Sequence, residues 1–273
     1  FESGLLFFYF SNADLGSHML WSAMDKNHPQ YDQRSDLVRD ALLEIYLEMD
    51  RMLGIAMESL DANDTLIVMS DHGFAPFSRS FHLNSWLKEN GYLKLLDDFS
   101  QGESEFFENV DWGGTKAYSL GFNGLYVNQI GREGQGTVAP GPQKDELMRE
   151  LRDKLEAVVD PETGKHAITN LYLAKEAYQG EYVNIAPDMI VGYNAGYRGS
   201  WETAIGKIPR ELFSDNDKKW TGDHCVDPVH VPGVLMSNKK IKVDDPALYD
   251  VSVTVLDEFG IEKPIDMVGR DIF

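Results

Sequence analysis

The sequence predicts an α/β fold with a largely parallel sheet, because short apolar runs alternate along the chain with stretches of helical periodicity. Strand-like runs cover residues 4–10, 65–70, 188–193 and 233–237. Helices are expected over residues 38–60, 81–92, 144–159 and 250–259. Since no internal repeat and no long linker interrupts this order, we expect residues 1–273 to form a single domain.

Three neighbouring segments begin this pattern. Residues 4–10 (GLLFFYF) are almost wholly apolar and have the length of a buried strand. Between Val38 and Leu60, apolar residues recur at helical spacing, and Asp36 suits the positive end of the helix dipole. The turn residues 61–64 (DAND) then lead into a second buried strand.

The middle of the chain, residues 80–135, differs in character and is expected to form a lid or insertion that contains a β-hairpin. Residues 115–129 alternate in polarity around the pair Asn123-Gly124, which is a strong short-range hairpin signal. Farther along, Asp160-Pro161 ends the helix expected over 144–159.

Composition and charge exclude several classes of protein. The hydrophobic content of 42% is that of a globular chain, and no apolar run approaches the roughly 20 residues of a membrane helix. The formal net charge of -20 argues against nucleic acid as a partner, and an enzyme for phosphate esters would need a local cation. Cys225 is the only cysteine, which excludes an internal disulfide and favours a cytoplasmic location.

Two Asp/His pairs directly follow strand-like runs. Asp14 and His18 are four residues apart, and on a helix that spacing points both side chains the same way. Asp71 and His72 are adjacent, and a tight turn permitted by Gly73 would let both reach one ion. Both residue types are good ligands for zinc and similar ions. Taken singly, each pair also fits an ordinary helix cap or polar turn.

His224 lies in a third polar cluster, close to the strand expected over 233–237. Asp223, Asp227 and His230 are near it in sequence and are equally possible ligands, so the residues alone leave this choice open. Three Asp/His clusters beside strand-like runs suit a metal site gathered at one edge of a sheet. Two carboxylates and three histidines exceed the ligands of one closed zinc ion, so two divalent ions are expected.

These clusters resemble those of the alkaline phosphatase superfamily, in its type I phosphodiesterase/nucleotide pyrophosphatase branch. The matching motifs are D-L-G-S-H (14–18), S-D-H-G-F (70–74) and G-D-H (222–224), with flanking similarity in 82–93, 186–197 and 250–273. The resemblance extends from residue 5 to the end and implies an alkaline-phosphatase-like three-layer sandwich. In one departure, Gly16 lies two residues before His18, where the family often has glycine directly before the histidine.

The resemblance implies that Asp14, His18 and His224 hold one metal ion and that Asp71 and His72 hold a second. Zinc is the expected metal, with manganese as an alternative. The family's further ligand, an aspartate, and its Thr or Ser nucleophile lie upstream of the first motif. Because the chain opens inside a strand-like run, without Met or signal peptide, we expect a C-terminal portion that lacks the nucleophile and has little activity alone.

The sequence therefore predicts metal-dependent hydrolysis of small-molecule or lipid phosphate esters, of the phosphodiesterase or nucleotide pyrophosphatase type. A sulfatase or phosphomutase of the same superfamily is an alternative, since the nucleophile helps to define the chemistry. A non-catalytic metal-binding relative is another. Arg198 is expected to be a solvated surface charge, with a phosphate oxygen as its other possible partner.

Overall fold

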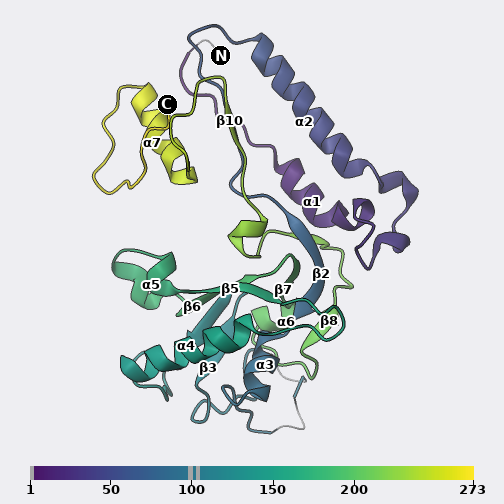
Figure 1. Cartoon of the computed structure of the whole chain (residues 1–273), viewed down its shortest axis with the longest axis vertical. Coiled ribbons are helices and arrows are strands. Elements are labelled where there is room, and N and C mark those ends of the chain that lie inside the picture. Colours follow the sequence, from purple (N-terminus) through teal and green to yellow (C-terminus); the bar gives the residue numbers. More distant parts are fainter. Residues whose placement is uncertain (1–2, 98–100, 103–104) are drawn as a thin grey trace. The chain divides into compact units, whose positions relative to one another are not determined.

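The computed structural model describes residues 3–97, 101–102 and 105–273, and it confirms the α/β class (Figure 1). The helices are α1 (Ser11–Met24), α2 (Ala41–Glu58), α3 (Leu83–Glu89), α4 (Pro142–Glu156), α5 (Ala174–Ala177), α6 (Trp201–Ala204) and α7 (Leu248–Glu258). The strands are β1 (Ile67–Met69), β2 (Ala75–Phe81), β3 (Ala117–Leu120), β4 (Gly124–Val127), β5 (Ile168–Leu173), β6 (Met189–Tyr193), β7 (Gly196–Gly199), β8 (Phe213–Asp215), β9 (Gly222–Asp223) and β10 (Leu235–Ser237).

The chain divides into two compact units, where the sequence pattern predicted one domain. The first unit runs to Met49 and resumes over Phe74–Val231, and the second comprises Asp50–Gly73 and Pro232–Phe273. The lid role expected for residues 80–135 stays a prediction, and that range includes 98–100 and 103–104, which lie outside the described residues.

One four-stranded sheet of the first unit has the strand order β3-β4-β6-β5, and every pairing in it is antiparallel. Helix α4 packs against β5 (Figure 1), and its apolar face buries Leu147, Met148, Leu151 and Leu155. These side chains join the hydrophobic core formed by the inward residues of the strands. The apolar spacing predicted for residues 144–159 therefore corresponds to a buried face of α4.

The second sheet of this unit is built around β2. Strand β7 pairs with β2 in parallel, whereas β8 and β9 pair with it antiparallel. In the short β2–β9 pairing, Ala75 lies opposite Asp223 and Pro76 lies opposite Gly222. This pairing carries the segment that follows β9, and with it His224, to the edge of the sheet.

The expectation of a largely parallel sheet is wrong for the described residues, since β2–β7 is the one parallel pairing among their named strands. The short turn between β3 and β4 requires their antiparallel pairing, because a parallel pairing needs a crossover of a dozen or more residues. Residues 4–10 form no strand; Leu5, Phe7 and Phe8 are 59–70% exposed, and α1 begins at Ser11.

The hairpin around Asn123-Gly124 is present, but its turn differs from a two-residue Asn-Gly turn. Leu120 lies opposite Gly124, so three residues form the connection between β3 and β4. The left-handed backbone falls on Gly121, whose φ is +75°. Asn123 has another role, since its Nδ2 donates to the carbonyl of Val191, 2.7 Å away, and so links the hairpin to β6.

The buried Asn84 joins α3 to β3. Its Nδ2 donates to the carbonyl oxygen of Ser119 (2.9 Å), and its Oδ1 accepts from the N–H of the same residue (2.8 Å). Replacing Asn84 with alanine should cost about 2–4 kcal/mol of unfolding free energy, because two buried backbone groups lose their partner. Urea unfolding checks this value, and Asn63→Ala in an exposed turn is the control. Equal stability of the two variants would contradict the prediction.

The second unit contains the antiparallel pair β1–β10, in which Ile67 lies opposite Ser237. Helix α7 holds the C-terminal segment through Asp250, whose carboxylate accepts from the N–H groups of Ala247 (2.8 Å) and Arg270 (2.9 Å). Among the described residues of the whole chain, no helix combines the length and the apolarity needed to cross a membrane.

Candidate metal centre

Helix α1 places Asp14 and His18 one turn apart. The ring of His18 is buried, with its Nδ1 2.8 Å from the carbonyl oxygen of Gly222. A carbonyl oxygen only accepts hydrogen bonds, so Nδ1 carries the hydrogen, and in the neutral ring Nε2 is the nitrogen suited to bind a metal. That Nε2 lies 3.6 Å from Oδ1 of Asp14.

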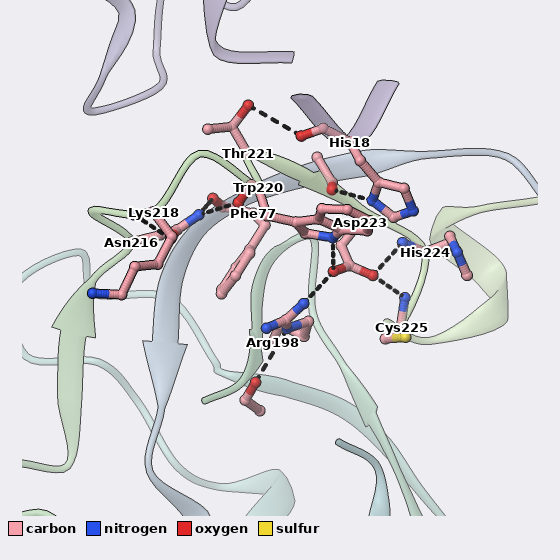
Figure 2. A network of polar contacts seen from close by, with 12 residues as sticks. His18, Phe77, Arg198, Asn216, Lys218, Trp220, Thr221, Asp223, His224 and Cys225 are labelled. Atoms are coloured by element: carbon pink, nitrogen blue, oxygen red, sulfur yellow. Dashed lines mark hydrogen bonds and ion pairs between the residues drawn. The ribbon is translucent and has the colours of Figure 1, made fainter. Parts of the chain in front are cut away.

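Strand β9 brings His224 to the same carboxylate. The N–H of Thr221 donates to the carbonyl of His18 (2.7 Å), and the N–H of Ser22 donates to Oγ1 of Thr221 (3.1 Å). These bonds fix α1 against the start of β9, and Figure 2 shows the further contact of the Thr221 hydroxyl with the His18 carbonyl oxygen, 3.5 Å away. Nε2 of His224 then lies 3.9 Å from Oδ1 of Asp14.

His18 and His224 each place a ring nitrogen beside the same carboxylate oxygen of Asp14. The Nε2 atoms of His18 and His224 lie 3.6 and 3.9 Å from one oxygen of Asp14, which is too far for hydrogen bonds. Two ligands of a tetrahedral zinc ion, each bound at about 2.0–2.1 Å, lie about 3.3 Å apart. Two imidazole nitrogens and one carboxylate oxygen form a donor set that zinc accepts.

Aromatic rings contact both histidines. The indole of Trp220 stacks on His18, with centroids 3.7 Å apart and an interplanar angle of 27°. Phe74 meets His18 and His224 edge-on, at 4.7 and 5.5 Å between centroids. These contacts restrict both imidazole rings and place apolar surface beside them.

Asp223 is the first alternative that the sequence left open, and its oxygens are already engaged. One oxygen accepts from the N–H groups of His224 (2.8 Å) and Cys225 (2.9 Å). The other accepts from Nε1 of Trp220 (2.8 Å) and from the guanidinium of Arg198 (Figure 2). Burial alone would raise the pKa of Asp223, but the charge of Arg198 and these bonds lower it. The carboxylate is therefore an anion held by the protein itself.

Cys225 is close to Asp223 and His224, and ligand atoms of the three lie within 4.8 Å of one another. Burial, reinforced by the neighbouring Asp223, raises the pKa of the Cys225 thiol to about 12. Metal ions bind the thiolate, and a raised pKa disfavours that form. Within this trio, both oxygens of Asp223 already accept hydrogen bonds from the protein.

Asp227 and His230 also have other partners. The buried Asp227 accepts from Nδ2 of Asn170 (2.9 Å) and the hydroxyl of Tyr172 (2.8 Å). Nε2 of His230 lies 2.8 Å from Oγ1 of Thr169. Among the four residues that were open in this segment, His224 is the one whose ring nitrogen faces Asp14.

The second unit carries Asp71 and His72 in a similar local geometry. The N–H of Ser70 donates to the carbonyl of Val234 (3.0 Å), which fixes the chain just beyond β1. Nδ1 of His72 lies 3.0 Å from the carbonyl oxygen of Gly73, so it carries the hydrogen, and Nε2 lies 3.6 Å from Oδ2 of Asp71. Here too a backbone carbonyl sets the tautomer and leaves Nε2 on the side of the carboxylate.

The chain matches the family model for type I phosphodiesterase / nucleotide pyrophosphatase over residues 2–218. It belongs to this family. The matched range of the type I phosphodiesterase family includes Asp14, His18, Asp71 and His72 and ends before His224. Membership confirms the resemblance to the alkaline phosphatase superfamily, whose phosphodiesterase branch hydrolyses phosphoesters and is typically metal-dependent.

Among solved structures, this phosphodiesterase family member is similar to human ectonucleotide pyrophosphatase / phosphodiesterase 5. The identity is 15%, the TM-score is 0.34, and the match covers 84% of this chain and 45% of that chain. The chain thus spans less than half the length of that structure. No curated protein matched this chain.

Sequence reasoning missed the residues that support the two histidines. Gly222 and Trp220 bind or stack on His18, and Arg198 binds Asp223. Arg198 is 1% exposed, so the expectation of a solvated surface charge was wrong. A signal existed in the W-T-G-D-H segment around the third cluster, but only the structure shows what these side chains contact.

Proposed function

We propose that this protein hydrolyses phosphodiesters or pyrophosphates of small molecules or lipids with two divalent ions, zinc being the first choice and manganese the second. The observation that carries the proposal is the convergence of His18 and His224 on one oxygen of Asp14, in a chain of the type I phosphodiesterase family. The Thr or Ser nucleophile is proposed to lie upstream of residue 1, as the family resemblance implies.

The first ion would be held by Asp14, His18 and His224, and the second by Asp71 and His72 with an aspartate from upstream. When bound, such ions supply positive charge that stabilises the oxygens of the reacting phosphate. The residues of this chain orient the site: the carbonyls of Gly222 and Gly73 direct Nε2 of each histidine. A pair of divalent ions also opposes the repulsion that a net charge of -20 exerts on phosphate esters.

The test is a substrate panel with metal content measured in parallel. Bis-p-nitrophenyl phosphate, p-nitrophenyl phosphate and p-nitrophenyl sulfate are given to this chain and to a version extended upstream. We expect the extended protein to prefer the diester, to lose activity in a chelator and to regain it with zinc or manganese. This chain alone should bind metal and show little turnover.

Each other result excludes one part of the proposal. Preference for the sulfate ester would make the protein a sulfatase, and stoichiometric metal without turnover in the extended protein would make it a binding relative. Full diesterase activity of this chain alone would show that its nucleophile lies within the 273 residues. Absence of bound metal would reject the metal centre itself.

A further inference from the structure

Arg198 is a fully buried cation within the first unit. Its side chain is 1% exposed, on strand β7. The guanidinium carbon lies 4.1 Å from the ring centroid of Phe77, 4.3 Å from that of Phe122 and 4.2 Å from that of Trp201. Nη2 is buried and has no hydrogen-bond partner among the described residues. Three aromatic faces attract the cation but do not satisfy all of its donors.

A buried cation of this kind is a poor device for stability alone. Arg198 pairs with Asp223, whose side chain is 2% exposed. Removing both charges from water carries a desolvation cost for each ion, and well-packed apolar residues often stabilise a fold as well as a buried pair does. A buried ion pair is better explained where its directional hydrogen bonds fix the orientation of neighbouring side chains, which apolar packing would not fix.

Asp223 connects this pair to both histidines of the candidate metal centre. One oxygen accepts from the N–H of His224 (2.8 Å) and thereby fixes the backbone that carries that ring. The other accepts from Nε1 of Trp220 (2.8 Å), and the indole of Trp220 stacks on His18 at 3.7 Å. Figure 2 shows Arg198 on one side of Asp223 and the two histidines on the other.

We propose that Arg198 is a positioning residue of the metal centre, which acts through Asp223 and Trp220 to hold the rings of His18 and His224. The inference rests on the proposed function, because it assigns these rings to a metal. Arg198 itself contacts neither ring, so its effect is on the affinity and geometry of the ion. Lysine would keep the charge but not the planar fork that aligns the carboxylate.

The experiment measures zinc affinity by competition with a chelating dye, and the visible absorption spectrum of the cobalt-loaded protein, for Arg198→Lys. We expect zinc at the first site to bind about 10–100-fold more weakly, as when a group behind a metal ligand is lost. The cobalt bands should shift, because the two imidazoles no longer keep their angle.

The matched control is Arg79→Lys, which alters another buried ion pair of the same unit. Arg79 binds Asp160 through Nε (2.9 Å), and the two side chains are 8% and 0% exposed. None of its hydrogen bonds involves the histidines of the metal centre. We expect this variant to lower the melting temperature while zinc affinity and the cobalt spectrum stay those of the unaltered protein.

A second variant, Trp220→Phe, keeps a ring over His18 and removes the bond from Nε1 to Asp223. It should weaken zinc binding by a smaller factor than Arg198→Lys does. If Arg198→Lys does not fold, the zinc affinity of Trp220→Phe tests the positioning role instead. In the metal-free protein, the amide proton of His224 should shift in both variants, because both disturb its acceptor.

The outcomes separate two failures. If Arg198→Lys melts lower, as Arg79→Lys does, but binds zinc and cobalt as the unaltered protein does, the positioning role is overturned and the metal centre stands. Unchanged affinity and spectrum in Trp220→Phe, where that variant alone is measurable, overturn it equally. If the unaltered protein takes up no stoichiometric metal, the proposed function fails, and this inference fails with it.

Discussion

Replacing His224 with alanine should remove one tightly bound metal ion per chain. His224 supplies one of the three proposed donor atoms, together with Oδ1 of Asp14 and Nε2 of His18, so its loss would leave two protein ligands. Loss of a group behind a ligand costs about 10–100-fold in affinity, so loss of the ligand itself should exceed about 100-fold. Metal analysis by mass spectrometry after gel filtration, together with zinc competition, gives the measurement.

The control for this variant is His166→Ala. His166 is exposed, and its Nδ1 lies 2.9 Å from the carbonyl oxygen of Glu156 in the same unit. The substitution removes an imidazole and leaves the candidate centre intact, so metal content should not change. Full metal content in His224→Ala, or equal loss in both variants, would contradict the ligand assignment. In the extended protein, diesterase activity should fall with the metal in His224→Ala only.

Replacing Gly222 with alanine should both destabilise the first unit and weaken its metal site. A Cβ at this position would lie 2.5 Å from the carbonyl oxygen of Ser17 and 3.0 Å from Cβ of Trp21. Both atoms belong to α1, so helix and strand must separate, which costs about 1–3 kcal/mol or more. The separation also moves the Gly222 carbonyl away from Nδ1 of His18. The temperature of thermal unfolding and the zinc affinity should both decrease in Gly222→Ala.

Gly54→Ala is the matched control, and the expected change in stability has the opposite sign. Gly54 lies within α2, and a Cβ there meets nothing within 4 Å. Alanine should stabilise the helix by about 0.5–1 kcal/mol and leave metal binding unchanged. A Gly222→Ala protein that melts at the normal temperature and binds zinc normally would show that α1 and β9 pack less closely than described.

The helices were the most predictable part of this fold. Residues 38–60 and 144–159 show apolar spacing over several turns, and α2 and α4 occupy most of those ranges. Strand positions were also predictable, as β6 within 188–193 illustrates. Strand direction was not, because an apolar run indicates burial and says nothing about its partner. Residues 4–10 make the same point, since an apolar run need not form a strand.

The candidate ligands were accessible to sequence reasoning because Asp and His recur together in three short motifs, at 14–18, 70–74 and 222–224. The geometry behind them was not. Gly222 acts through its carbonyl and its missing Cβ, and neither leaves a pattern in one sequence. The burial of Arg198 depends on Phe77 and Phe122, which lie far from it along the chain. Contacts between such distant residues carry no local periodicity.

The bond between His18 and Gly222 also orders events in time. It joins residues 204 positions apart, so the ring of His18 can take its final orientation only after nearly the whole first unit has been synthesised and assembled. Closing a loop of this length costs conformational entropy, which is offset only when the other contacts of the unit form with it. An ion at this centre would therefore enter a largely finished unit. It would consolidate the folded state and would not nucleate it, unlike the ion of a zinc finger.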